Sequence, residues 1–160
     1  MFGKAIWFDM DGTLYDLYKI PGWLAALQNE DWSIYNQPGY CRANLNRIRN
    51  AIHALAEMGW TVGVITWAAK DVYDEETLAA IEEEKVKWLR ENIPELDRMA
   101  CLPYGYDKAQ FIEEMEEVYA VNYLVDDNAL VRKEWRKHGE GFHTINASRA
   151  FYRYLEGLVG

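Results

Sequence analysis

Short apolar runs alternate along this chain with longer segments in which apolar residues recur every three or four positions. The short runs are typical of buried strands, and the longer segments are typical of helices with one apolar face. We predict strands at 4–8, 61–65, 98–102, 121–125 and 142–145. We predict helices at 44–58, 75–92, 108–119 and 129–138, and a last one that Ser148 caps and that ends near Leu158. This alternation indicates an α/β fold, a three-layer sandwich whose central, mainly parallel five-stranded sheet is covered on both faces.

Residues 15–43 lack this alternation and are too numerous for an ordinary connection. We expect a single domain over 1–160 in which 15–43 is a small cap or lid insertion after the first strand. The segment is rich in aromatic residues, namely Tyr15, Tyr18, Trp23, Trp32, Tyr35 and Tyr40. Their rings could stack on a planar substrate such as a nucleobase, or they could pack the segment onto the body of the protein. Tyr15 and Tyr18 are the expected substrate contacts.

Composition narrows the classes of partner. A chain of 160 residues is long enough for one domain with a sizeable core. The net charge of −9 argues against a stable nucleic-acid complex, because binding a phosphate backbone needs a basic face. The two cysteines, Cys41 and Cys101, match no metal-binding or redox spacing and fit a reducing compartment. No apolar run approaches the ~18 residues of a membrane helix, and the first strand leaves no room for a signal peptide. We therefore expect a cytoplasmic protein with no membrane partner, and the sequence leaves its oligomeric state open.

Polar residues follow three of the predicted strands directly. Asp9 and Asp11 end the first apolar run, Thr66 follows the second, and Asp126-Asp127 follow the fourth. Residues two apart in an extended chain point the same way, so Asp9 and Asp11 can face one point. In open parallel sheets, ligands bind beyond the carboxyl ends of the strands, where the strand order reverses. The sequence therefore predicts that side chains more than a hundred residues apart meet at one edge of the sheet.

Phosphoryl transfer is the chemistry that these residue types fit. Asp9 would attack phosphorus and form an aspartyl-phosphate, and Asp11 would donate a proton to the leaving oxygen and later accept one from water. A Mg²⁺ ion would be held by the Asp9 side chain, the Asp11 main-chain carbonyl and Asp126. This ion allows an anionic nucleophile to approach a dianionic phosphate. Asp127 would support the metal through hydrogen bonds or a bound water.

The transferred phosphoryl group needs further donors. Thr66 and the N–H of Trp67 would bind a phosphoryl oxygen, and a lysine would neutralise the developing charge. Lys108 is our choice for this lysine, because it opens a helix whose N-terminus already favours anions. Lys70 and Lys85 are the alternatives.

These motifs, DMDGT at Asp9–Thr13, then Thr66, Lys108 and Asp126-Asp127, together resemble the haloacid dehalogenase (HAD) superfamily of phosphohydrolases. The resemblance spans the whole chain and implies a Rossmann-like sheet and a Mg²⁺-dependent phosphatase. In outline the chain is also similar to the 5'-deoxynucleotidase type. We predict a phosphomonoester hydrolase acting on a small phosphorylated metabolite, for example a nucleoside monophosphate. The alternatives are a non-catalytic phosphate- or nucleotide-binding regulatory module, and a phosphotransferase with an acceptor other than water.

Overall fold

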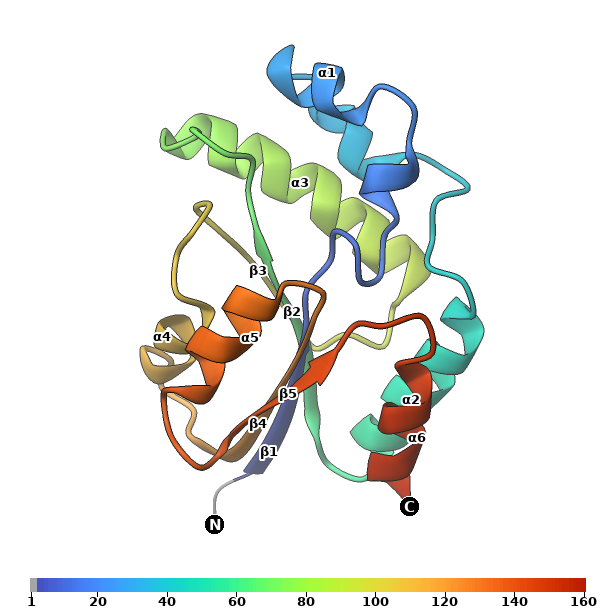
Figure 1. Ribbon diagram of the computed structural model, residues 1–160, viewed down its shortest axis with the longest axis vertical. Helices are drawn as coiled ribbons and strands as arrows, with labels where there is room; N and C mark the ends of the chain where they lie inside the picture. Colours follow the sequence, from blue (N-terminus) through green and yellow to red (C-terminus); the bar gives the residue numbers. More distant parts are fainter. Residues whose placement is uncertain (1–2) are drawn as a thin grey trace.

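Five parallel strands form the centre of the computed structural model, which describes residues 3–160 (Figure 1). They are β1 (Gly3–Phe8), β2 (Thr61–Trp67), β3 (Arg98–Leu102), β4 (Tyr119–Asp126) and β5 (Phe142–Asn146). Their order is β3-β2-β1-β4-β5, so β1 is central. Successive strands are added on one side of β1 up to β3 and on its other side from β4, so the strand order reverses between β1 and β4. The predicted fold class is confirmed, and every strand pair is parallel.

Helices cover both faces of this sheet. Three of them, α2 (Leu45–Glu57), α3 (Glu75–Asn92) and α6 (Tyr152–Val159), pack on one face, while α4 (Lys108–Glu113) and α5 (Ala129–Arg136) pack on the other (Figure 1). Alternate residues of β1 serve the two cores: Ile6 and Phe8 belong to the first, and Trp7 to the second. Both cores bury the central strand, which is why β1 reads as a continuous apolar run.

The ring of Trp7 lies directly against β2 at Gly63. A Cβ atom at this glycine would lie 2.5 and 2.7 Å from two carbons of the Trp7 ring, closer than van der Waals contact allows. The indole Nε1 of Trp7 also donates a hydrogen bond to Asn122 Oδ1 at 3.2 Å, which satisfies its buried polar group. The missing side chain at Gly63 therefore leaves room for the Trp7 ring, which lies between the paired strands β1 and β2 and helix α4.

Residues 15–43 form three short helices beyond the carboxyl ends of the strands: η1 (Leu17–Lys19), α1 (Trp23–Gln28) and η2 (Trp32–Asn36) (Figure 1). The two ends of the segment pair with each other. Asp16 N–H donates to Tyr40 O at 2.7 Å, and Arg42 N–H donates to Leu14 O at 2.9 Å. The segment is therefore anchored at one place on the body. Its role as a cap, and the single-domain organisation, remain predictions.

Two predicted helix boundaries were wrong. The helix predicted at 108–119 ends at Glu113, and β4 begins at Tyr119. Four glutamates, at positions 113, 114, 116 and 117, would place negative charge at a helix C-terminus that is itself partly negative, so extending the helix is unfavourable. Ser148 does not cap the last helix, which begins at Tyr152 after Phe151 without a side-chain cap.

Each helix among residues 3–160 is too short or too polar to cross a bilayer. The cytoplasmic location and the absence of nucleic-acid and membrane partners remain predictions.

Candidate active site

The reversal of strand order between β1 and β4 places Asp9 beside Asp126. Backbone pairing continues past β1, since Asp9 N–H donates to Val125 O at 2.9 Å. The chain then turns back at Gly12, whose φ of +81° suits glycine. A Cβ at Gly12 would also collide with the carboxylate of Asp127. The glycine of the DMDGT motif is thus required both for the turn and for the close approach of Asp127.

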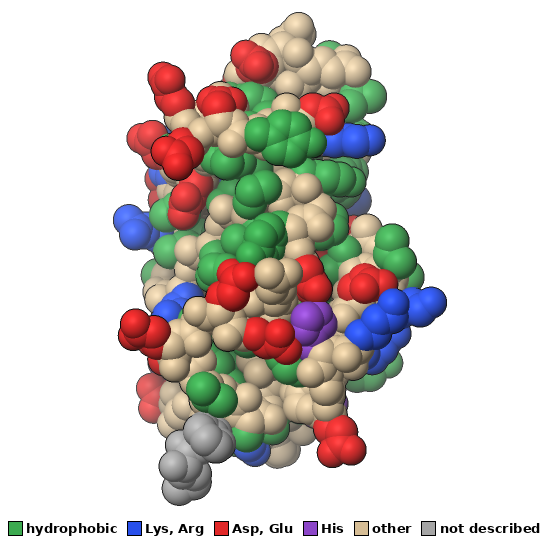
Figure 2. All heavy atoms as spheres, turned by 90° about the vertical axis from the view of Figure 1, so that its left-hand side faces the viewer, with side chains coloured by type: hydrophobic (Ala, Val, Ile, Leu, Met, Phe, Trp, Pro, Cys, Tyr) green, Lys and Arg blue, Asp and Glu red, His purple; other side chains and the backbone are tan. Residues whose placement is uncertain are grey.

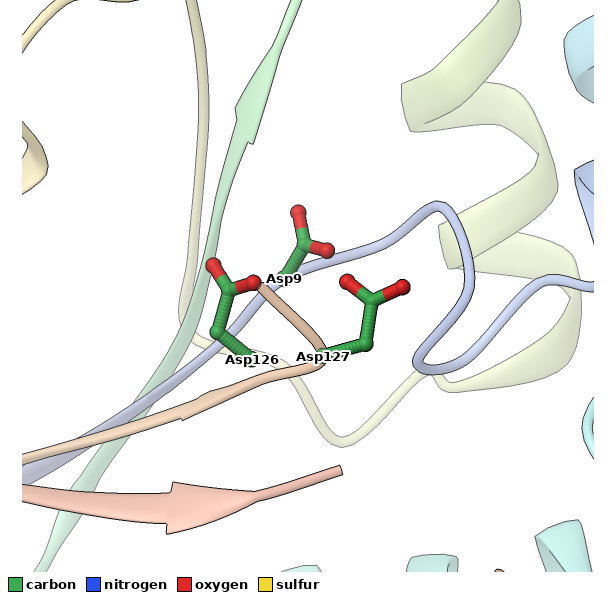
Figure 3. A group of neighbouring side chains, drawn as sticks. All are labelled: Asp9, Asp126 and Asp127. Atoms are coloured by element: carbon green, nitrogen blue, oxygen red, sulfur yellow. The ribbon is translucent and has the colours of Figure 1, made fainter. Parts of the chain in front are cut away.

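Three carboxylates meet at this point. Asp9, Asp126 and Asp127 each offer an oxygen within 4.8 Å of the others. Figure 3 shows their side chains projecting together from the ends of β1 and β4. Asp126 is almost fully buried, whereas Asp127 is only partly covered and faces solvent on one side. The structure therefore brings together Asp9 and Asp126, the two aspartates whose side chains were predicted to bind the metal, and it adds Asp127 to them.

Lys108 reaches this cluster from the first turn of α4. Its Nζ lies 3.0 Å from Asp9 Oδ1 and 2.9 Å from Asp126 Oδ2. The helix start is fixed by Asp107, whose Oδ1 accepts hydrogen bonds from the N–H groups of Ala109 and Gln110, as a helix N-cap does. Burial alone would lower the pKa of Lys108, but the charges of Asp9 and Asp126 outweigh it and raise the pKa. The lysine is therefore a fixed cation inside the cluster.

The pKa values of Asp126 and Asp127 are raised by burial and by the neighbouring carboxylates. Burial raises the pKa of Asp126, and the charge of Asp9 adds to the effect while Lys108 opposes it. Burial and the charges of Asp9 and Asp126 raise the pKa of Asp127 to about 7. A divalent cation with oxygen ligands would relieve this repulsion, and carboxylates are the ligands that Mg²⁺ prefers. The donor set of Asp9, Asp126 and Asp127 fits such an ion.

Lys85 occupies a different position, beneath Asp11. Its Nζ donates to Asp11 Oδ2 at 2.8 Å, to Thr66 Oγ1 at 2.8 Å and to Trp67 O at 2.7 Å. The side chain is fully buried. The three candidate lysines thus occupy different places. Lys108 contacts Asp9, Lys85 is buried against Asp11 and Thr66, and Lys70 lines the cavity above the site.

A cavity of about 360 Å³ opens above Asp9, Asp11 and Lys108. This size is within the range of small-molecule sites. Its walls come from residues 15–43, from the end of β2 and the loop that follows it, and from the loop after β3. They carry five aromatic side chains, namely Tyr18, Trp23, Tyr35, Trp67 and Tyr104, together with several aliphatic ones. Thr66 lies behind this wall, 2% exposed, with its hydroxyl on Lys85. A second cavity of about 390 Å³ adjoins the first between α4 and α5 and shares Trp67, Tyr104 and Lys108.

The prediction that Tyr15 contacts substrate was wrong. Tyr15 is fully buried, and its hydroxyl donates to Ile34 O and accepts from Gln37 N–H at 2.8 Å. Burial raises its pKa to about 12, so it stays neutral. The residue fixes the path of the 15–43 segment. Tyr18, the other predicted contact, does line the cavity, and its ring packs edge-on against Trp23 with centroids 5.0 Å apart.

Two residues near the site were missed from the sequence. The guanidinium of Arg42 donates to Gly12 O at 2.9 Å and to Ser148 O at 2.6 Å, and so ties the DMDGT turn to the loop after β5. Nothing in its sequence context indicates this. The ring of Tyr104 packs against Trp67 with centroids 5.0 Å apart. Its position four residues before Lys108 was a usable signal, because that loop leads into the predicted phosphate-binding helix.

No protein-family model and no curated protein sequence matches this chain. Solved structures do match it. The D,D-heptose 1,7-bisphosphate phosphatase from B. bronchiseptica, complexed with magnesium and phosphate, is 17% identical with a TM-score of 0.52, over 96% of this chain and 99% of that one. The phosphatase-containing N-terminal part of BF1531 from Bacteroides fragilis, complexed with Mg, is 17% identical with a TM-score of 0.58, over 98% of this chain and 39% of that one. The HAD domain of the effector protein Lem4 from Legionella pneumophila is 13% identical with a TM-score of 0.55, over 98% and 93%.

These likenesses define the class of fold. The chain has the α/β fold of the haloacid dehalogenase-like hydrolases, and the fold that its motifs implied is confirmed. The looser likeness to 5'-deoxynucleotidases remains a prediction.

Proposed function

We propose that this protein is a Mg²⁺-dependent phosphomonoester hydrolase that acts through an aspartyl-phosphate on Asp9. The observation that carries the proposal is the position of Lys108 between Asp9 and Asp126, with Asp127 beside them, on the floor of an open cavity. A nucleophile, a fixed cation and a set of metal-binding oxygens are thus gathered within reach of one ligand. The solved structures of the same fold that contain phosphatases support this choice.

Asp9 begins the reaction. One of its carboxylate oxygens forms a bond to phosphorus while the ester P–O bond breaks, and the leaving oxygen takes the electron pair together with a proton from Asp11. In the second step Asp11 accepts a proton from the attacking water, the aspartyl-phosphate bond breaks, and Asp9 and inorganic phosphate are released. Lys108 uses two of its three N–H groups on Asp9 and Asp126, which leaves the third to donate to a phosphoryl oxygen.

The metal would be held by oxygens of Asp9, Asp126 and Asp127 and by the main-chain carbonyl of Asp11. When bound, Mg²⁺ supplies positive charge that offsets repulsion between the carboxylates and the phosphate. We give Asp127 a direct role where the sequence had suggested a supporting one. Asp126 accepts from Lys108 through Oδ2 and from Asn128 N–H through Oδ1. Asp127 contacts the carboxyl group of Asp9 and forms no ion pair with a lysine or arginine among residues 3–160.

For the substrate we propose a small phosphomonoester with a planar leaving group, such as a nucleoside monophosphate. The cavity walls supply the aromatic surface, mainly Tyr18, Trp67 and Tyr104, on which a base can stack. Figure 2 shows the neighbouring α4–α5 side of the molecule, where hydrophobic side chains lie among acidic ones. Such a surface favours leaving groups that carry no further negative charge.

Asp9→Asn tests the proposal most directly. The variant keeps the shape of the side chain but is a poor nucleophile, so we expect hydrolysis of p-nitrophenyl phosphate to fall at least about a thousandfold. EDTA should silence the wild type, and added Mg²⁺ should restore it. Asp31→Asn is the matched control, because Asp31 is exposed and asparagine can replace it as the helix cap of η2.

Activity in Asp9→Asn equal to that of Asp31→Asn would refute the proposed nucleophile. A wild type that binds Mg²⁺ and nucleotides yet hydrolyses no ester would instead indicate a regulatory binding module. Transfer of the phosphoryl group to added alcohols in preference to water would indicate a phosphotransferase.

A further inference from the structure

Lys85 is a fully buried cation that the proposed chemistry does not use directly. A lysine ammonium has three N–H groups and no acceptor. All three find oxygen partners at 2.7–2.8 Å: Asp11 Oδ2, Thr66 Oγ1 and Trp67 O. No N–H group remains for a phosphoryl oxygen. Lys85 therefore does not bind substrate, although it touches Asp11, to which we assign proton transfer, and Thr66, which the sequence predicts to bind a phosphoryl oxygen.

These contacts fix the hydrogen-bonding role of Thr66. Because Lys85 can only donate, the Thr66 oxygen must accept from it. The hydroxyl hydrogen of Thr66 then points elsewhere and can be donated. The contact thus excludes the orientation in which the hydroxyl hydrogen points toward Lys85.

The same lysine makes the two carboxylate oxygens of Asp11 different from each other. Oδ2 is held by Lys85, while Oδ1 is buried and has no hydrogen-bond partner among residues 3–160. Asp11 itself lines the cavity. A buried polar atom without a partner is costly and is usually explained by a ligand or a catalytic role. Oδ1 is therefore the oxygen that is left to meet the leaving group.

The lysine is also held firmly in place. It projects from α3 on the buried face that carries Ile81, Trp88 and Leu89. Above it lies the ring of Tyr35 from η2, with its centroid 4.4 Å from Nζ. Lys85 thus joins four parts of the fold: α3, the turn after β1, the end of β2 and the 15–43 segment.

We propose that Lys85 is a positioning residue that orients Asp11 for proton transfer and Thr66 for donation, without contacting substrate. The inference rests on the proposed function. In the first chemical step, the proton would move from Oδ1 of Asp11 to the ester oxygen as the P–O bond breaks and that oxygen keeps the electron pair. Loss of Lys85 should then impair the proton transfer more than the attack by Asp9.

Lys85→Met tests this by comparing two leaving groups. An alkyl phosphate needs a proton on its leaving oxygen, whereas p-nitrophenolate leaves readily without one. We expect kcat/KM for the alkyl ester to fall about 10²-fold and kcat/KM for p-nitrophenyl phosphate to fall less than tenfold. The comparison uses kcat/KM because it reports the steps up to formation of the aspartyl-phosphate, whereas kcat also contains the later hydrolysis that both esters share. Lys87→Met is the matched control, since Lys87 is exposed on the same helix. Circular dichroism and thermal unfolding establish that the variants are folded.

A double-mutant comparison identifies the partner. If Lys85 acts through Asp11, adding Lys85→Met to Asp11→Asn should not change the ratio of the two kcat/KM values any further. Where Lys85→Met fails to fold, Lys85→Arg replaces it, because its planar guanidinium cannot reproduce the three contacts of an ammonium and should cause the same selective loss.

Equal losses for the two esters, or a ratio that changes independently of Asp11, would overturn the role of Lys85 while the proposed function stands. A wild type that hydrolyses neither ester would overturn both.

Discussion

Lys108→Met should separate the structural cost of the carboxylate cluster from its chemistry. The ammonium lies 3.0 Å from Asp9 and 2.9 Å from Asp126, and Asp126 is 1% exposed, so water cannot replace the lost contact. Removing one partner of a buried ion pair costs about 3–5 kcal/mol, because the remaining charge is left uncompensated. In a domain of this size each kcal/mol lowers the Tm by about 2–4 °C. We therefore expect the variant in EDTA to melt roughly 6–20 °C below the wild type.

Two conditions should reduce this loss. Millimolar Mg²⁺ would return positive charge to Asp9 and Asp126, so it should stabilise Lys108→Met more than it stabilises the wild type. Acid should also help, because protonation removes the uncompensated charge. Phosphatase activity should remain low in both conditions, since neither supplies the N–H group for the phosphoryl oxygen.

Thermal unfolding in EDTA and in Mg²⁺, at about pH 5 and about pH 8, measures all of these effects. Lys137→Met is the matched control. Lys137 pairs with Glu134 at the surface, and such exposed pairs contribute at most about 1 kcal/mol. If Lys108→Met melts in EDTA like the Lys137 variant, the ion pairs do not stabilise the cluster and the reasoning fails.

Two further predictions follow from contacts in the sheet and the cluster. Asp127 has an ordinary pKa near 3.8 that is raised to about 7 in the folded protein, so the folded state holds a proton that the unfolded state has lost between these values. The Tm in EDTA should therefore fall as pH rises through this window. The stabilisation by Mg²⁺ should grow over the same range, because the ion competes with that proton. Asp127→Asn should flatten both trends, and unchanged trends in that variant would contradict the assignment. Gly63→Ala should destabilise the protein by about 1–3 kcal/mol in urea unfolding, because the new methyl meets the Trp7 ring, and Trp7→Phe should recover part of that loss if the ring is the obstacle.

The strands were the most predictable part of this protein. In β1 the buried residues Ala5–Phe8 form an unbroken apolar run that ends at Asp9. β4 contains Asn122 but closes with the buried apolar pair Leu124-Val125 directly before Asp126. The carboxyl ends of parallel strands share one edge of the sheet, so the meeting of these aspartates follows from the pattern alone. Metal binding and catalysis by these residues remain proposals to be tested by experiment.

Side-chain direction was harder to predict. Tyr15 follows the DMDGT turn closely enough to suggest a substrate contact, yet it pairs with Cys41 and its ring turns into the core. This pairing joins residues 26 apart within a segment that has no regular pattern, and no local signal indicates it. The burial of Lys85, which the sequence offered only as an alternative to Lys108, could by contrast have been predicted. This lysine lies four residues after Ile81 and three before Trp88, on the apolar stripe of α3, where a lysine must either be paired or be excluded.

Burial and the charges of Asp9 and Asp126 raise the pKa of Asp127 to about 7, and the distribution of lysines leaves this shift without a compensating cation. Asp9 and Asp126 share Lys108, and Asp11 has Lys85, while Asp127 has no ammonium partner within residues 3–160. Four carboxylates against two lysines leave a formal charge of −2 when all are ionised, which is the charge that one divalent cation neutralises. Two further buried lysines, four in all, would have balanced the four carboxylates permanently and left no electrostatic demand for a metal. With only two lysines, the folded protein keeps uncompensated negative charge at Asp127. This residue lies on the exposed side of the cluster, where a cation can enter and displace a proton.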